Sequence, residues 1–144
     1  MADTKIEFIK ARKEDLSILQ LWRNDPVTRS LSRRNHEFSF EDVEAWVFNE
    51  GKNFYIAHSC GDRIGFVSYG PHDSSGALEI SIVVAPEFRG KGVGKLMLSE
   101  AVQNASAPLY AQVRKNNLSS IALFKSCGFV ETNTDCDYVE FITH

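Results

Sequence analysis

The chain has 144 residues, of which 43% are hydrophobic and 24% charged, and its formal net charge is −3. This length and composition predict one globular domain over residues 1–144 with a core of its own. The acidic balance excludes the broad basic surface of a nucleic-acid-binding protein, and no stretch approaches the roughly 20 apolar residues of a membrane span.

The first third of the chain predicts one strand and two helices. Asp25-Pro26 ends the first helix, since the residue before a proline avoids the helical region. Ser39, with Asp42 three residues later, predicts the capped start of the second helix. In chain order we expect a strand over residues 5–10, a helix over 13–24, a polar and basic loop with one helical turn over 27–39, and a helix over 40–49.

The rest of the chain predicts three strands in a row and then helices that alternate with strands. Gly61-Asp62 predicts a hairpin turn between the first two of these strands. The third strand reads ALEISIVVA, and such an apolar, β-branched run is typical of a central strand. We expect strands over residues 54–59, 63–69, 77–85, 109–113, 129–130 and 138–142, and helices over 93–104 and 118–126.

This order of elements, β-α-α-β-β-β-α-β-α-β-β, defines the expected fold class. It contains only two βα crossovers, so most neighbouring strands must run antiparallel. We therefore expect an α/β (α+β) protein with a mixed, mostly antiparallel twisted sheet flanked by about four helices.

The most informative motif is the glycine-rich segment Arg89-Gly90-Lys91-Gly92-Val93-Gly94 between the third of these strands and a helix. Glycines let the backbone turn tightly and approach a ligand closely. The free N–H groups and the dipole at the start of the helix attract negative charge. Arg89 and Lys91 add formal positive charge, so the segment predicts a phosphate or pyrophosphate site.

Two common phosphate-binding motifs do not fit this segment. A Walker A loop needs Ser or Thr after Gly-Lys, but Leu96 follows Gly94-Lys95. A dinucleotide-binding fingerprint needs GxGxxG directly after a strand and an acidic residue about 20 positions later. Here the spacing is GxGxG, and the sequence around residue 112 reads Gln-Val-Arg-Lys.

The segment V-x-P-x-x-R followed by G-x-G-x-G resembles the coenzyme A loop of the GCN5-related N-acetyltransferases, the GNAT superfamily. A second motif supports the resemblance, because an Asn at 117 opens the predicted helix and Gly128-Phe129 closes it. One helix and one strand separate the two motifs, as in that family. The resemblance covers residues 77–130.

The resemblance implies a role for each matching residue. The strand that ends at Val84 is expected to part from the strand over residues 109–113, and the pantetheine arm of acetyl-CoA is expected to lie in the gap. An N–H group near Val83 or Val84 is expected to stabilise the thioester oxyanion. Asn117 is expected to bind the pantetheine arm. The implied cofactor-binding residues are Ile82, Val83 and Val84 for the pantetheine amides, and Arg89, Gly90, Lys91, Gly92, Val93, Gly94 and Lys95 for the pyrophosphate.

Glu79 is the candidate catalytic base. Amine acceptors are mostly protonated at neutral pH, so a group must accept a proton before or during the attack on the thioester. Glu79 shares a face of its predicted strand with Ser81 and Val83, which places it near the implied gap. A structural glutamate that pairs with a neighbouring element is an equally good interpretation. His36 in the polar loop is a second candidate, although a lone loop histidine is more often a surface residue.

The chain departs from the family pattern at one position. Many members carry a Tyr in the second motif that protonates the leaving thiolate, and here that position is Phe124. Phe124 can pack against the cofactor or the core, but it cannot donate a proton. Tyr138 and Ser126 are the substitutes considered, and the thiolate can also leave without specific help.

These observations predict an N-acetyltransferase that moves an acetyl group from acetyl-CoA to a primary amine in a ternary complex. A small molecule, an amino sugar among them, or a protein N-terminus is the expected acceptor. Residues 21–29 resemble the opening of a branch that acetylates nucleotide-linked amino sugars and of ribosomal-protein acetyltransferases. Arg33-Arg34 could meet a phosphate of such an acceptor or of coenzyme A, and Arg23 could contact an acceptor or cap its helix.

Two alternatives remain open at this point. A catalytically silent acyl-CoA-binding regulatory module would keep the loop and lack the chemistry, and Phe124 favours it. A nucleotide-binding protein would prefer ATP or NAD.

Three cysteines without CxxC spacing predict neither a disulfide framework nor a zinc site, so no metal is expected. We expect a cytoplasmic monomer or homodimer.

Overall fold

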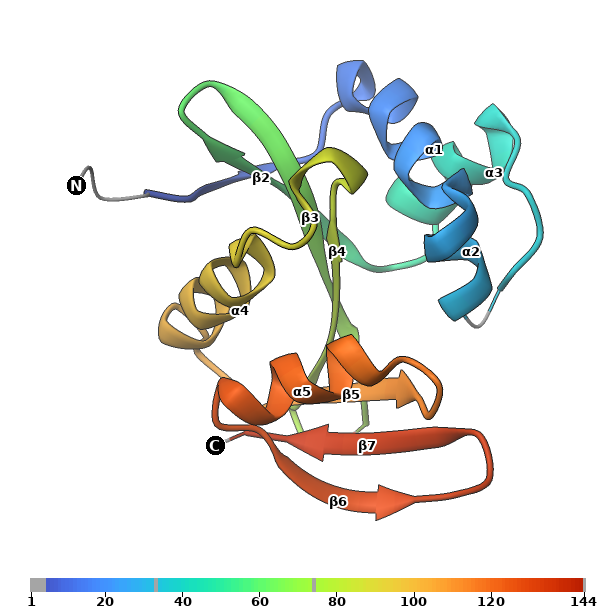
Figure 1. The fold of residues 1–144 in the computed structure, drawn as a ribbon. Helices are drawn as coiled ribbons and strands as arrows, with labels where there is room; N and C mark the ends of the chain where they lie inside the picture. Colours follow the sequence, from blue (N-terminus) through green and yellow to red (C-terminus); the bar gives the residue numbers. More distant parts are fainter. Residues whose placement is uncertain (1–4, 33, 74, 144) are drawn as a thin grey trace.

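A seven-stranded sheet forms the centre of the computed structural model, which describes residues 5–32, 34–73 and 75–143. The strand order is β1-β2-β3-β4-β5-β7-β6, and only β4 and β5 run parallel (Figure 1). The strands are β1 (Glu7–Lys10), β2 (Asn53–Ser59), β3 (Asp62–Pro71), β4 (Leu78–Val84), β5 (Leu109–Arg114), β6 (Val130–Thr134) and β7 (Tyr138–Ile142). The helices are α1 (Leu16–Asn24), α2 (Pro26–Leu31), α3 (Phe40–Phe48), α4 (Val93–Gln103) and α5 (Leu118–Ser126), with 3-10 turns η1 (Lys13–Asp15) and η2 (Pro86–Phe88).

The expected fold class is confirmed, with three local differences. The loop after the first helix begins with the six-residue helix α2, because the Asp25 carboxylate caps the N–H of Thr28 and Pro26 takes the first helical position. The β2–β3 turn is centred on Cys60 and Gly61, both with positive φ, rather than on Gly61-Asp62. Strand β6 continues to Thr134, because it pairs with β7 as far as Val139.

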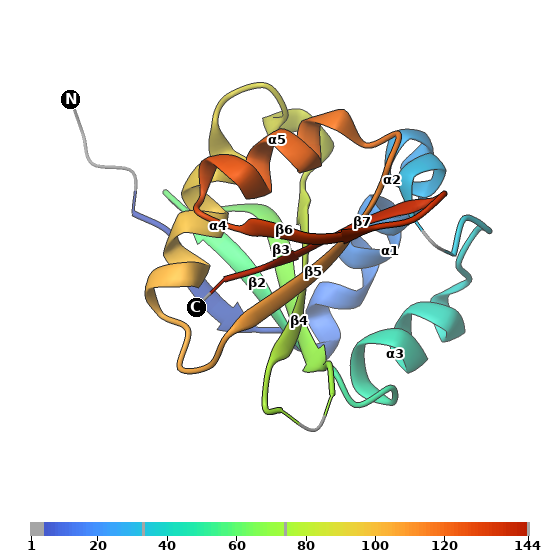
Figure 2. The same ribbon diagram turned by 90° about the horizontal axis from the view of Figure 1, so that it is seen from below.

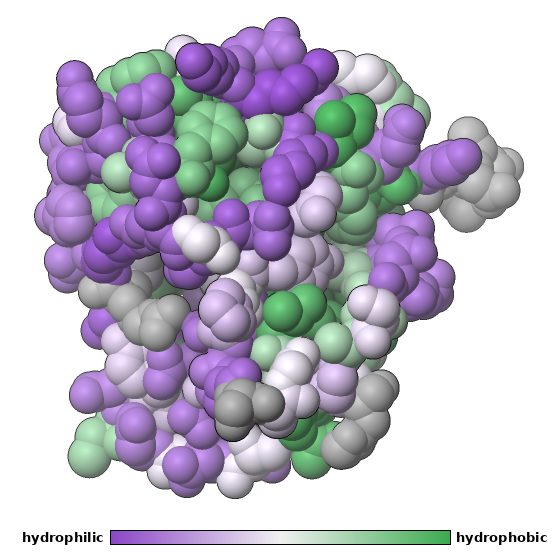
Figure 3. Space-filling model, turned by 180° about the vertical axis from the view of Figure 1, so that it is seen from behind, coloured by the Kyte–Doolittle hydropathy of each residue, from purple (hydrophilic) through white to green (hydrophobic). Residues whose placement is uncertain are grey.

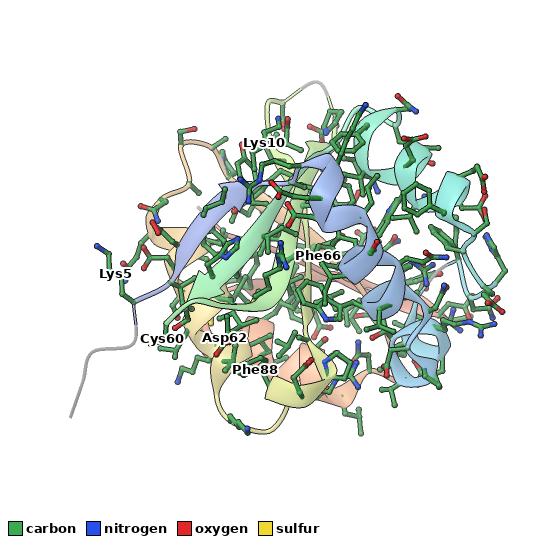
Figure 4. All side chains as sticks on the ribbon, turned by 90° about the horizontal axis from the view of Figure 1, so that it is seen from above. Lys5, Lys10, Cys60, Asp62, Phe66 and Phe88 are labelled. Atoms are coloured by element: carbon green, nitrogen blue, oxygen red, sulfur yellow. The ribbon has the colours of Figure 1, made fainter. Side chains whose placement is uncertain are left out.

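Helices cover both faces of the sheet. Helices α1, α2 and α3 lie over one face, and α4 and α5 lie over the other (Figures 1 and 2). On the α1–α3 face, Phe66 lies between the sheet and α1 (Figure 4) and packs with Leu19, Trp22 and Trp46. On the opposite face, Leu98 of α4 belongs to the buried cluster that α5 shares with β5 and β7. Two separate cores therefore hold the two helical layers on the sheet.

Strand β4 contributes alternate side chains to these two cores. Ile80, Ile82 and Val84 pack on the α4–α5 side, whereas Val83 packs on the α1–α3 side. Because side chains alternate along a strand, Glu79 and Ser81 share the face of Val83. Glu79 is therefore placed on the side of the sheet that α1, α2 and α3 cover.

The parallel pair β4–β5 is unusually short. Its ladder contains only Leu78 opposite Leu109 and Glu79 opposite Tyr110. By contrast, β3 and β4 pair over seven residues, and β5 and β7 pair over five. Beyond Glu79 the two strands diverge toward their carboxyl ends, so the expected splay is present in the structure.

The surface seen from behind is mostly hydrophilic, with apolar residues in small separate groups (Figure 3). Such scattered apolar residues are normal on the surface of a globular protein. None of the helices among the described residues has both the length and the apolar character needed to span a bilayer.

Candidate active site

The glycine-rich loop has the backbone that an anion site requires. Gly90 and Gly92 have φ of 75° and 76°, and Gly92 is the N-cap of α4 in the left-handed region. A Cβ built on either glycine would meet no atom within 4 Å, so these positions are glycine for their backbone conformation rather than for lack of space. Leu96 donates to the carbonyl of Gly92, which leaves the N–H groups before it at the open start of α4.

Gly94 has a different role from the other two glycines. A Cβ at Gly94 would lie 3.3 Å from Cγ2 of Val84 and 3.5 Å from Cδ2 of Leu123. The missing side chain therefore lets the first turn of α4 pack closely against the end of β4 and against α5. This packing brings the three elements that carry the predicted cofactor site to one place.

The backbone of β4 presents polar groups to the divergence from β5. Ala85 donates to Ile64 of β3 at 2.8 Å, whereas Leu78 donates to Pro108, on the β5 side, at 3.0 Å. N–H groups alternate in direction along an antiparallel ladder. The N–H groups of Ile82 and Val84 therefore point toward the divergence, and that of Val83 points toward β3.

Asn117 caps α5, as its position in the sequence predicts. Its Oδ1 accepts from the backbone N–H of Ser120 and from the hydroxyl of Ser119, both at 3.2 Å. Among the described residues, none accepts a hydrogen bond from the Asn117 amide nitrogen. The cap therefore fixes the side chain at the end of β5 with its two amide donors available.

The Arg89 guanidinium is directed at α2 rather than along the glycine loop. It donates to the carboxylate of Asp25 at 2.7 Å and to the hydroxyl of Thr28 at 2.8 Å. Burial raises the pKa of Asp25, but the hydrogen bonds from Arg89 and Thr28 outweigh this effect and hold the pKa below its usual value. The contact ties the cofactor loop to the α1–α2 junction across 64 residues of sequence.

Two lysines complete the charge of the loop. Lys91 and Lys95 are both exposed, and the Lys91 ammonium lies 5.7 Å from the centre of the Phe88 ring. With the guanidinium of Arg89 held by α2, these lysines are the cations that remain on the loop and the first turn of α4.

Glu79 lies where β4 and β5 begin to diverge. It is half-buried and stands opposite Tyr110 in the last pair of the short ladder. His72 stacks on the Tyr110 ring, with the ring centres 3.6 Å apart. Neither Tyr110 nor His72 belongs to a motif that the sequence alone reveals. The alternation in β5 predicts the face of Tyr110, but the register that brings it beside Glu79 arises only in the fold.

The structure places the remaining candidates apart from this point. Phe124 is 3% exposed and packs edge-on against Phe129, within the core beneath α5. Ser126 lies at the end of α5 remote from Asn117, and its hydroxyl donates to Leu123. Tyr138 pairs with Arg114 at the open end of β5. Exposed His36 stacks on Phe38 in the segment between α2 and α3.

The divergent strands, the glycine loop at a helix start and the capping Asn117 together define an acyl-coenzyme A-dependent transferase. The family model described as the acetyltransferase (GNAT) family matches residues 16–129. The chain therefore belongs to the GNAT acetyltransferase family, whose enzymes use acetyl-CoA as the donor. The predicted family, fold and enzyme class are confirmed.

Several relatives in sequence are acetyltransferases. The ribosomal protein bS18-alanine N-acetyltransferase of Salmonella typhimurium is 24% identical over 118 residues, which are 78% of this chain and 79% of that protein. The spermidine N(1)-acetyltransferase of Vibrio cholerae is 24% identical over 140 residues, 88% of this chain and 73% of that protein. A 50-residue segment is 44% identical to an uncharacterised Mycobacterium leprae protein and spans 34% of this chain and 14% of that protein.

Solved structures share the fold at lower identity. The aminoglycoside acetyltransferase AAC(6')-Ib in complex with coenzyme A has a TM-score of 0.83 and 18% identity, covering 96% of this chain and 94% of its own. The Vibrio cholerae spermidine N-acetyltransferase in complex with coenzyme A and spermine has a TM-score of 0.78 and 19% identity, covering 95% and 93%. Among the described residues, no group of three or more His, Cys, Asp or Glu side chains is placed to hold a metal ion.

Proposed function

We propose that this chain transfers the acetyl group of acetyl-CoA to a primary amine of a small molecule or a protein N-terminus. The observation that carries the proposal is the meeting of the β4–β5 divergence with the glycine loop at the start of α4. In a family member, this backbone can pair with an extended arm along β4 and bind the phosphates of the arm at the start of α4.

The backbone does most of the donor binding in this proposal. The N–H groups of Ile82 and Val84 face the divergence, where a pantetheine amide can pair with β4 as a missing strand would. The open N–H groups of residues 90–95, with Lys91 and Lys95, take the pyrophosphate. Asn117 offers its amide donors to the arm from the β5 side, and Arg89 holds the loop against α2.

The reaction is a direct attack. The amine nitrogen forms a bond to the thioester carbonyl carbon, and the carbon–sulfur bond breaks as coenzyme A leaves as the thiol. An acceptor that arrives as an ammonium ion must also lose one proton to the enzyme or to solvent. Of the N–H groups that point into the divergence, we propose that of Ile82 for the oxyanion, because it lies nearer to Glu79, and that of Val84, beside the glycine loop, for a pantetheine amide.

Glu79 is the residue that we propose as the base. It lies at the vertex of the divergence, on the sheet face opposite α4 and α5, so a carboxylate oxygen can accept the proton of an amine that approaches from the α1–α3 side. Phe124 is buried in the core, so the proton for the leaving thiolate comes from solvent or from the positively charged nitrogen that has bonded to the carbonyl carbon. No separate side-chain acid is needed in this scheme.

Release of coenzyme A thiol from acetyl-CoA in the presence of a panel of amines tests the proposal. The expected result is thiol release that depends on an amine and yields an acetylated product by mass spectrometry. Binding of acetyl-CoA without acetylation of any amine would instead support the regulatory module. Greater thermal stabilisation by ATP or NAD than by coenzyme A would support a nucleotide-binding protein.

A further inference from the structure

Arg23, in the last turn of α1, is a buried cation that forms no ion pair with any residue that the structure describes. Its residue is 5% exposed, and its Nη2 donates to the carbonyl of Arg34. Among the described residues, no acid forms an ion pair with Arg23, and its buried Nη1 has no hydrogen-bond partner. Burial, followed by the charges of Arg34 and Arg29, lowers the pKa of Arg23 from its usual value to about 10.

Aromatic packing and hydrogen bonds hold this guanidinium in place. It lies 4.2 Å above the centre of the Phe38 ring and 5.8 Å from that of Trp46. Asn24 fixes Phe38 in turn, since its Oδ1 accepts from the Phe38 N–H at 2.7 Å and its Nδ2 donates to the Phe38 carbonyl at 2.8 Å. Within the described part of the chain, these contacts hold Arg23 in position, and no acid takes part in them.

Two further arginines extend the positive charge to the surface. Arg29 donates to the carbonyl of Asn35 at 3.3 Å, and the Arg34 guanidinium lies 5.4 Å from the centre of the same Phe38 ring. Glu50 binds Arg34 at 2.8 Å, but both side chains of this pair are at least one-third exposed, so solvent screens it. Arg23, Arg29 and Arg34 form what we call the arginine cluster; Arg33 lies outside the described residues.

We propose that the arginine cluster binds an oxyanion, a phosphate or a carboxylate, that the amine acceptor carries. A buried charge that is not paired is costly, and an anion beside residues 34–36 would offset that cost. Guanidinium groups suit phosphate and carboxylate because their donors match the geometry of both. The inference rests on the proposed acetyl transfer and specifies its acceptor class.

The position of the cluster favours the acceptor over the donor as the source of the anion. Asp25 and Thr28, which face the cofactor loop, are both engaged by Arg89. The Arg23 and Arg29 side chains turn instead to the segment after α2, away from that contact. The cluster also repels polycations, so we expect this chain to disfavour spermidine and aminoglycosides.

Matched pairs of amines test the proposal. Each pair adds an anion to the same type of amine: ethanolamine with O-phosphoethanolamine, glucosamine with glucosamine 6-phosphate, and β-alaninamide with β-alanine. We expect kcat/KM to be at least about tenfold higher for the anionic member of one or more pairs. The phosphate and carboxylate pairs tell the two oxyanions apart.

In the double variant Arg29→Gln/Arg34→Gln, kcat/KM for the anionic amine should fall close to that for its neutral partner. The matched control is Arg12→Gln, which changes an exposed arginine outside the cluster and should leave the preference for the anionic amine unchanged. Binding is also measured without turnover. With coenzyme A at saturation, so that the glycine loop is filled, inorganic phosphate should raise the melting temperature of the wild-type protein more than that of the double variant.

The outcomes separate the two proposals. If no amine is acetylated, the acetyltransferase proposal fails, and the phosphate titration still tests the cluster. If neutral and anionic amines react equally well, acetyl transfer stands and the anion proposal is overturned. It is also overturned if the double variant loses affinity for coenzyme A but not for 3′-dephospho-coenzyme A, since the anion would then belong to the donor.

Discussion

The proposed donor side and the proposed acceptor side of this molecule are built by different means. The donor side consists mainly of backbone: two left-handed glycines, the start of α4 and the N–H groups of β4 that face the divergence. The acceptor side consists of side chains, with Arg23, Asn24 and Phe38 interlocked between α1 and α3. A backbone site suits a ligand shared by a whole family, whereas a side-chain site can change with the acceptor.

The substitution Gly92→Glu breaks the donor side most severely. A glutamate at φ 76° strains the N-cap of α4 and places a negative charge in the anion site. We expect the affinity for acetyl-CoA to fall by about 100-fold or more in isothermal titration calorimetry. Gly51→Glu is the matched control, because Gly51 has φ 74° and equally open space but follows α3. A similar loss in both variants would contradict the assignment of the loop.

Glu79→Gln probes the point where the two sides meet. Loss of the proton acceptor should lower kcat by about 100-fold with little change in the affinity for acetyl-CoA. The pH profile of kcat should also lose the limb that reports the base. Glu7→Gln on β1 is a suitable comparison, since this exposed residue pairs with His58 at the far edge of the sheet. An unchanged kcat for Glu79→Gln would leave Glu79 with a structural role.

The Arg89–Asp25 contact links the two sides, and a double-mutant cycle measures how much this ion pair contributes to stability. Arg89→Gln, Asp25→Asn and the combined variant should show a coupling of roughly 0.5–1 kcal/mol in the free energy of unfolding. If Arg89 only positions α2, both single variants should raise KM for the amine more than the dissociation constant of coenzyme A. Weaker coenzyme A binding in Arg89→Gln alone would identify it as a phosphate ligand.

The smallest expected effect concerns pH. The pKa of Asp25 is lower in the folded protein than its usual value, so its contribution to stability is present above about pH 4 and is lost as the pH falls through the lowered value. Asp25→Asn removes this contribution. Denaturant titrations should therefore show a smaller decrease in stability between neutral pH and strong acid for the variant than for the wild-type protein.

The same contrast explains what the sequence could predict. The glycines of the loop act through backbone conformation, and the Asn117 side chain acts as a cap at a helix start, so the spacing of these residues is informative. The order of the strands along the chain followed from the sequence, but their register in the sheet did not, and only the register places Tyr110 beside Glu79. The direction of the Arg89 side chain depends on α2, which lies 64 residues earlier and which the sequence predicted only as a turn. Nothing in the sequence around Arg23 indicates that its side chain is buried and forms no ion pair with a described acid.

The two-residue ladder between β4 and β5 also has a mechanical consequence. One block of the sheet contains β1 to β4 and the other contains β5, β7 and β6, and few backbone bonds join them. Without a donor, the blocks are expected to open independently, and the amide hydrogens of β5 should exchange with solvent faster than those of β3. A bound pantetheine would connect the two blocks by hydrogen bonds. With coenzyme A at saturation, the amide hydrogens of β5 should therefore exchange with solvent at rates close to those of β3.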